Sequence, residues 1–190
     1  MKLIIASNNA HKIYEIKTIL GGKFSEILSM REAGIVHETV EDGTTFMENA
    51  LKKAKEIAEL SSCAALADDS GICVDHLDGA PGIFSARFSG QHGDDQANNE
   101  LLLSKLENTE QRGAHYTAAV ALVYPDGRAV TAEGYMYGDI TRDPRGTRGF
   151  GYDPLFVPTG MTKTVAELTD EQKNAISHRG AALRALLEKL

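Results

Sequence analysis

The sequence predicts an α/β protein, because apolar runs typical of buried strands occur together with apolar patterns typical of helices. Leu3–Ala6 and Cys63–Ala67 are short continuous apolar runs, which are typical of buried strands. Apolar residues recur at helical spacing after Ala10, after Thr45 and again from Leu183 to Leu190. The chain has 190 residues, enough for one domain or for a domain with a small lobe.

The composition narrows the class of protein and its compartment. Hydrophobic residues make up 42% and charged residues 25%, the balance of a globular chain rather than a disordered one. The formal net charge is −7, and no basic face of the kind that binds duplex nucleic acid is visible. No apolar run approaches membrane-spanning length, and Met1–Ala6 is too short for a signal peptide. Two cysteines outside any Cys-x-x-Cys pair fit a reducing compartment, so we expect a cytoplasmic protein.

The first strand leads through a polar segment, Ser7–Lys12, into a helix that continues to Leu20. Asn8 or Asn9 is expected to cap this helix. Free amides at a helix N-terminus favour an anion, and Lys12 lies within the first turn. These features suit a phosphate, although the Gly-Lys-Ser/Thr pattern of a Walker loop is missing.

The next segment, 27–40, is a connection with short strand potential. Thr45 and Glu48 then form a capping-box pattern at the start of the second helix. Lysines 52, 53 and 55 lie away from its apolar face, where solvation is their ordinary role. Glu41 precedes this helix, where it gains from the helix dipole or points at a metal held by Asp69.

Asp68 and Asp69 follow the apolar run Cys63–Ala67, and we expect both at the end of a strand. Charged groups taken out of water are costly unless they are exposed, paired or bound to a cation. One hypothesis is a carboxylate pair that holds a divalent metal and activates water. The other is an ordinary turn, because Asp, Ser70 and Gly71 are common turn residues.

The middle of the chain predicts a helix and a hairpin. A turn-rich stretch, 78–90, contains Arg87, which is a candidate anion contact or a structural ion pair. A helix begins within 93–98, and its apolar set includes the leucines at 101–103 and 106. Tyr116–Tyr124 and Ala129–Tyr137 are expected to pair around the turn Pro125–Arg128.

The last part of the chain carries a glycine-aromatic stretch, Arg145–Pro154. It forms either a turn-rich crossover or a surface on which a base stacks. A short strand, 155–157, follows, and Ser177 is expected to cap the final helix. Lys173, His178 and Arg179 gather near that helix start, where cations oppose the dipole, so we expect an anion there.

Taken together, these segments resemble the inosine triphosphate pyrophosphatase family, also called Ham-type. The segments occur in the family's order and span nearly the whole chain. They are Ser7–Lys12, Glu41–Ala50, Ala67–Gly71, Gly79–Arg87, Gly149–Pro154 and Ile176–Gly180.

The resemblance implies an elongated α/β fold, with two lobes, a long mixed central sheet flanked by helices, and an active-site cleft between the lobes. Residues 1–190 would form a single domain whose lobes are not independent. The implied activity is hydrolysis of non-standard purine nucleoside triphosphates (dITP, ITP, XTP and dXTP) to the monophosphate and pyrophosphate, with Mg²⁺. The implied partners are the nucleotide and a second copy of the chain in a homodimer.

The resemblance also assigns roles to residues. Asp69 matches the metal-binding and water-activating carboxylate, Glu41 a second metal ligand, and Asp68 a supporting group. Ser70 matches a substrate contact. The residues that match the triphosphate-binding loop or contact phosphate are Ser7, Asn8, Asn9, Ala10, His11, Lys12 and Lys53. Those that match the base-side loop and the distal substrate contacts are Phe150, Gly151, Tyr152, Asp153, Lys173, His178 and Arg179.

Two positions depart from the family pattern, and two alternatives stay open. Asn8 stands where the family often has glycine, and asparagine tolerates positive φ better than most residues. Arg148 also stands where many members of the family have glycine, and it either adds a cation near the base-side loop or points to solvent.

Two other functions stay open beside the hydrolysis of non-standard purine nucleotides. They are a Maf-like pyrophosphatase for modified nucleotides and a nucleotide-binding regulator without turnover.

Overall fold

The computed structural model describes residues 1–190. The strands are β1 (Lys2–Ile5), β2 (Glu26–Ser29), β3 (Ala64–Val74), β4 (Gly113–Val123), β5 (Ala129–Ile140) and β6 (Phe156–Pro158). The α-helices are α1 (Ala10–Leu20), α2 (Phe46–Ser61), α3 (Asp95–Lys105), α4 (Asp170–Ile176) and α5 (His178–Leu187). Short 3₁₀ turns are η1 (Asp75–Leu77), η2 (Gly82–Arg87) and η3 (Val165–Glu167).

The strands form one mixed six-stranded sheet in the order β2-β1-β3-β4-β5-β6. β1 runs parallel to both β2 and β3, and Leu3 is aligned with Ile27 on one side and Ala64 on the other. β6 pairs antiparallel with β5. The predicted α/β class with a mixed sheet flanked by helices is therefore confirmed.

The chain divides into two compact units, with two core clusters in the first and one in the second. The first comprises 1–69, 118–134 and 178–190, and the second comprises 70–117 and 135–177. In the second unit, β4 and β6 contribute Tyr116 and Phe156, whose rings pack edge to face with centroids 4.8 Å apart. α3 contributes Leu102 to the same core.

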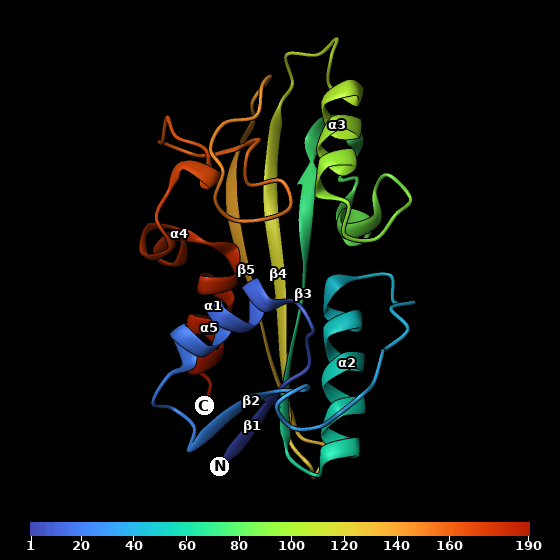
Figure 1. The fold of residues 1–190 in the computed structure, drawn as a ribbon, viewed down its shortest axis with the longest axis vertical. Helices are drawn as coiled ribbons and strands as arrows, with labels where there is room; N and C mark the ends of the chain where they lie inside the picture. The colour runs from blue at the N-terminus through green and yellow to red at the C-terminus, as the bar shows by residue number, and fades with distance from the viewer. The chain divides into compact units, whose positions relative to one another are not determined.

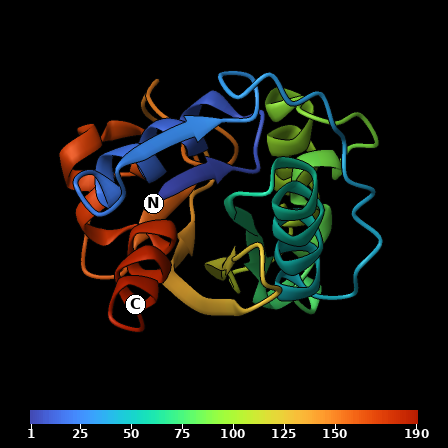
Figure 2. The ribbon, with the colours of Figure 1, turned by 90° about the horizontal axis from the view of Figure 1, so that it is seen from below.

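In the first unit, helices cover both faces of the strands (Figures 1 and 2). Side chains alternate along a strand, so consecutive residues of β1 enter different cores. Leu3 and Ile5 pack with residues of α1 and α5, whereas Ile4 packs with residues of α2. Because both faces are covered, β1 is a continuous apolar run, as expected of a parallel strand in this position.

A glycine on β5 sets how closely α5 approaches the sheet. A Cβ added to Gly134 would collide with the backbone of α5 at His178 and Ala182. The absence of a side chain at this position lets the helix lie directly on the strand. The start of α5, which carries His178 and Arg179, is placed by this contact.

The helix caps follow the sequence closely. The side chain of Asn9 accepts hydrogen bonds from the amides of His11 at 3.0 Å and Lys12 at 3.1 Å. Thr45 accepts from the amide of Glu48 at the start of α2. Asn8 is not among the residues with positive φ, so the tolerance expected of it there is not used.

The expectation that Asp68 and Asp69 end a strand is wrong, and so is the turn that was its alternative. β3 continues through both residues to Val74, and both side chains are buried. Leu66 belongs to the core beneath α1 and α5, and Ala67 to the core beneath α2. By the same alternation, Asp68 faces α1 and α5, and Asp69 faces α2. The two neighbouring carboxylates therefore serve opposite faces of the sheet.

Candidate active site

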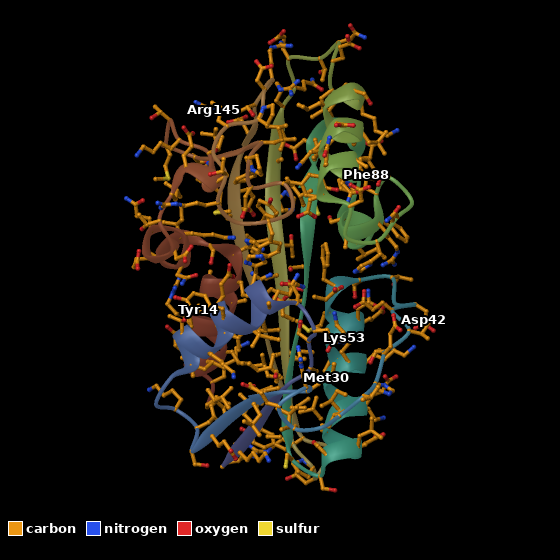
Figure 3. The ribbon with its side chains drawn as sticks, viewed as in Figure 1. Tyr14, Met30, Asp42, Lys53, Phe88 and Arg145 are labelled. Atoms are coloured by element: carbon orange, nitrogen blue, oxygen red, sulfur yellow. The ribbon has the colours of Figure 1, made fainter.

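On the α2 face of the first unit, Asp69 lies in a cluster with Lys53 and Glu41. The ammonium of Lys53 is 2.8 Å from Glu41 Oε1 and 3.1 Å from Asp69 Oδ1. It also donates to the backbone oxygen of Asp68 at 3.0 Å. Lys53 lies on the side of α2 that faces the strands, and the labelled Asp42 lies on the other side (Figure 3). The two predicted metal ligands, from segments far apart in sequence, thus converge on one cationic nitrogen.

Asn49 completes this cluster one helical turn before Lys53. Its amide nitrogen donates to Asp69 Oδ2 at 3.2 Å, and its amide oxygen accepts from the backbone N–H of Gly43 at 2.9 Å. Burial raises the pKa of Asp69, and the nearby Lys53 and Lys12 charges offset this only in part. Burial by itself would lower the pKa of Lys53. The negative charges of Asp69 and Glu41 outweigh that effect, so the pKa of Lys53 is raised.

On the opposite face, Asp68 lies between Lys12 of α1 and Arg179 of α5. Lys12 Nζ is 2.6 Å from Asp68 Oδ2, and Arg179 Nε is 3.1 Å from Asp68 Oδ1. The guanidinium of Arg179 also binds Glu15 of α1. Arg179 is only 1% exposed, and Glu15 is buried as well. Each buried charge therefore has an opposite partner, the condition under which such groups are tolerated.

The electrostatics of this second cluster keep its carboxylate ionised. Burial alone would raise the pKa of Asp68, but the charges of Arg179 and Lys12 and their hydrogen bonds hold it well below its usual range. Burial lowers the pKa of Lys12, and Asp68 opposes that effect. The anion expected near the start of α5 is thus supplied to Arg179 by the protein's own carboxylates.

In the second unit, the glycine-aromatic loop is organised by Asp153. Its carboxylate accepts from Lys173 Nζ at 2.7 Å and from the backbone N–H of Phe150 at 3.1 Å. Lys173 Nζ also lies 4.6 Å from the centroid of the Phe150 ring, within cation–π range. A Cβ added to Gly149, where φ is +76°, would collide with Asp153 Oδ2. The loop is therefore held on a buried ion pair.

Further contacts in the second unit fix the same loop. The hydroxyl of Tyr152 donates to the backbone oxygen of Ser85 at 2.8 Å. The N–H of Gly151 donates to Asp95 Oδ2 at 2.6 Å, and the Gly151 carbonyl accepts from Asn99 at 3.0 Å. Tyr152 and Asp153 are buried with their polar atoms bonded inside the protein, whereas Phe150 is half-buried. Of the two aromatic rings in this loop, that of Phe150 is therefore the more exposed.

Comparison with known proteins identifies the family. The model of the Ham1 family matches residues 3–189. The chain belongs to the Ham1 family.

Similar proteins support this assignment over the full length. The chain is 50% identical to a dITP/XTP pyrophosphatase of Streptomyces coelicolor, and the alignment covers 98% of this chain and 95% of that protein. It is 51% identical to a dITP/XTP pyrophosphatase of Leuconostoc mesenteroides, covering 100% and 96%. A solved structure of a HAM1 protein from Coxiella burnetii superposes with a TM-score of 0.90 at 36% identity, covering 100% of both chains. The predicted family is confirmed.

The predicted site residues of this Ham1 chain fall in both units. Those in the first unit are Ser7, Asn8, Asn9, Ala10, His11, Lys12, Glu41, Lys53, Asp69, His178 and Arg179. Those in the second unit are Ser70, Phe150, Gly151, Tyr152, Asp153 and Lys173. Ser70 follows Asp69 on β3 and is half-buried, and His178 is buried at the start of α5. Arg148 donates weakly to the backbone oxygen of Leu168, at 3.4 Å.

Sequence reasoning missed Glu15 and Asn49. Glu15 lies three residues after Lys12 and one before the buried Ile16, so a charged residue beside the apolar stripe was a usable signal. Asn49 lies four residues before Lys53, which places both on the same side of α2. Their partners are distant in sequence, and no local spacing indicates them.

The two carboxylates of the α2 face fit a magnesium ion. No group of three or more His, Cys, Asp or Glu side chains forms a metal cage in the structure. Mg²⁺ binds through one or two carboxylates and keeps its other positions for water and substrate phosphates. Glu41 and Asp69, whose oxygens already converge on the ammonium of Lys53, match that donor set.

None of the helices combines the length and the apolar character that a membrane-spanning helix needs.

Proposed function

We propose that this chain hydrolyses dITP and XTP, together with ITP and dXTP, to the nucleoside monophosphate and pyrophosphate, and so removes deaminated purines from the nucleotide pool. The observation that carries the proposal is the convergence of Glu41 and Asp69 on Lys53 in a chain of the Ham1 family. The names of relatives at about half identity over the full chain support the substrate class.

Lys12 and Lys53 are the residues we assign to the triphosphate. Both are largely buried and each contacts a carboxylate, so neither is an ordinary solvated lysine. A charge held in a site with little water acts strongly on a phosphate, because it is weakly screened. At the start of α1, the side chain of Asn9 already accepts hydrogen bonds from two backbone amides, so those amides are not available to a phosphate. We therefore assign the positive charge at this position to the side chain of Lys12.

Asp69 and Glu41 are assigned to a divalent cation and to the attacking water. Water adds to the α-phosphorus, the bond to the bridging oxygen breaks, and pyrophosphate leaves with the electron pair. We assign to Asp69 the proton that the water loses, and the support for this is that contacts with Asn49 and Lys53 hold its carboxylate in one orientation. A bound Mg²⁺ would supply Lewis-acid stabilisation of the phosphate charge and a more acidic water.

The loop that contains Phe150 is assigned to the base. An aromatic ring open to a ligand stacks on a purine, and the buried Asp153–Lys173 pair holds the ring's backbone in place. Selectivity for a 6-oxo purine requires hydrogen-bond donors in the protein that face the 6-oxo group. The 6-amino group of adenine cannot accept from them, so adenine would leave these donors unpaired.

The test is release of pyrophosphate from dITP, XTP, ATP and GTP in Mg²⁺, coupled to an inorganic pyrophosphatase. We expect turnover of dITP and XTP and little turnover of ATP or GTP. Absence of pyrophosphate from both deaminated substrates would refute the proposal. Tight binding of dITP without hydrolysis would favour the regulator, and turnover confined to modified pyrimidine or methylated nucleotides would favour the Maf-like alternative.

Three further assignments rest on the family resemblance. We propose Mg²⁺ as the metal, a homodimer as the assembly and the cytoplasm as the location. Light scattering after size-exclusion chromatography tests the homodimer, and replacement of Mg²⁺ by Ca²⁺ in the turnover assay tests the metal.

A further inference from the structure

The carboxylate of Asp69 is held at both of its oxygens by two residues of α2. Lys53 contacts Oδ1 at 3.1 Å and Asn49 donates to Oδ2 at 3.2 Å. The two residues are one helical turn apart, so a single helix presents both donors to the strand. A carboxylate bonded at both oxygens has lost its freedom to rotate about its side-chain bonds.

The two donors differ in what they do to the charge of Asp69. The ammonium of Lys53 is a cation that also binds Glu41, so it neutralises the same carboxylates that would hold a metal. The amide of Asn49 is neutral, so it orients Asp69 and leaves its negative charge available. If Lys53 were displaced from Asp69 Oδ1 by a cation or a phosphate, the bond from Asn49 to Oδ2 would still hold the carboxylate.

Asn49 also connects Asp69 with the segment that carries Glu41. Its amide oxygen accepts from the N–H of Gly43 at 2.9 Å, two residues after Glu41. Gly43 has no space for a side chain, because an added Cβ would lie 2.6 Å from Asn49 Oδ1 and 2.9 Å from Glu48 Cβ. Asn49 is 1% exposed, so both hydrogen bonds are shielded from water.

We propose that Asn49 is a positioning residue that fixes Asp69 and the Glu41 segment in one geometry for a divalent cation, an inference that rests on the function proposed above. A residue behind a metal ligand orients the ligand without touching the metal, and its loss commonly costs about 10–100-fold in metal affinity or activity. Asn49 makes both of the contacts that such a role requires, one to each side of the predicted metal site.

The experiment compares Asn49→Ala with a matched control, Asn98→Ala. Asn98 is also a buried helical asparagine whose side-chain oxygen accepts from a loop amide, that of Ser89 at 2.8 Å, but it lies in the second unit and contacts no carboxylate of the site. Mn²⁺ binding is measured by electron paramagnetic resonance in the presence of α,β-imido-dITP, which is not hydrolysed. kcat and KM for dITP are measured in parallel, and thermal unfolding is followed for every variant.

For Asn49→Ala we expect Mn²⁺ affinity and kcat to fall by about 10-fold or more, with KM for dITP changed less than about 3-fold. Asn98→Ala should lower the melting temperature and leave Mn²⁺ affinity and kcat near wild type. In an Asp69→Asn background, Asn49→Ala should weaken Mn²⁺ binding no further, because the group it orients is no longer a carboxylate. Wild-type Mn²⁺ affinity in Asn49→Ala, or an equal loss in the Asp69→Asn background, would overturn the proposal.

Gly43→Ala provides a second route if Asn49→Ala does not fold. Its added Cβ pushes on the amide of Asn49 without removing it, so Mn²⁺ affinity should fall, and an unchanged affinity would contradict the proposal. Wild-type protein that binds no Mn²⁺ with the analogue would also overturn it. Failure of the proposed function looks different: wild-type protein would then bind Mn²⁺ and release no pyrophosphate from dITP.

Discussion

The carboxylate of Asp68 accepts hydrogen bonds from Arg179 across 111 residues of sequence, at 3.1 Å from Nε and 3.3 Å from Nη2. This contact joins the middle of β3 to the start of α5, and Lys12 of α1 binds the same carboxylate. Three elements of the first unit are therefore tied together by one fully buried acid. The side chain of the next residue, Asp69, points to the other face of the sheet.

Asp68→Asn should destabilise the protein, because it removes the charge that offsets Lys12 and Arg179 in a buried setting. Loss of one partner from such a pair typically costs about 3–5 kcal/mol. Urea unfolding at pH 7 measures the change in the free energy of unfolding. Asp42→Asn breaks an exposed pair with Lys52 and serves as the control. Equal losses in the two variants would contradict the assigned difference in burial.

Asp69→Asn should abolish pyrophosphate release from dITP while leaving the fold intact. The substituted amide keeps the shape of the side chain but loses the charge that a divalent cation requires. Turnover and thermal unfolding are measured on the same preparation. Retained turnover would remove Asp69 from the role assigned to it.

Gly149→Ala should disturb the base-side loop more than Gly151→Ala does. Both glycines have positive φ, +76° and +61°, so each substitution carries a backbone cost of about 1–2 kcal/mol. Only at Gly149 would the new Cβ also collide with Asp153, which binds Lys173 and the Phe150 amide. We expect a larger rise in KM for dITP and a lower melting temperature for Gly149→Ala. Indistinguishable KM values would show that Asp153 does not organise the loop.

Gly134→Ala should push α5 away from β5, because the added Cβ would meet the helix backbone at His178 and Ala182. Overpacking of this kind costs about 1–3 kcal/mol. Since α5 carries Arg179, activity should fall together with stability. The free energy of unfolding and kcat are the measurements. Gly21→Ala is the control for the loss of a glycine, because Gly21 does not have a positive φ and its added Cβ would lie 3.3 Å from the nearest atom, the backbone oxygen of Lys17. A Gly134→Ala variant as stable as wild type would contradict the close approach.

Acid should remove the contribution of Glu32 to stability. Hydrogen bonds from Lys17 and from Ser29 lower the pKa of Glu32 from 4.5 to about 2. Because the folded-state pKa lies below the unfolded value, this contribution is fully present above pH 4.5 and is lost as the pH falls to about 2. The difference in urea midpoint between wild type and Glu32→Gln should therefore shrink over that window. A difference that stays constant from pH 6 to pH 2 would refute the assignment.

The sequence by itself determined the fold class, the family and the order of most elements. Apolar runs such as Leu3–Ala6 and the caps at Asn9 and Thr45 are local signals, and local physics decides them. The motifs shared with the Ham1 family also indicated Glu41 and Asp69 as a pair of metal ligands and Lys53 as a phosphate contact. These assignments came from the similarity of whole segments to the family, because the spacing of the three residues in the sequence does not indicate that they are related.

Only the tertiary structure decided what each charged residue faces. Asp68 and Asp69 are identical neighbours in the sequence, and the alternation of side chains along β3 sends them to different helices. Arg179 was expected to contact substrate, and its partners in the fold are Asp68 and Glu15. Asn49 could not be recognised until packing brought α2 against β3. Charges and amides act over a few ångströms, so their roles depend on which distant segments the fold brings within that distance.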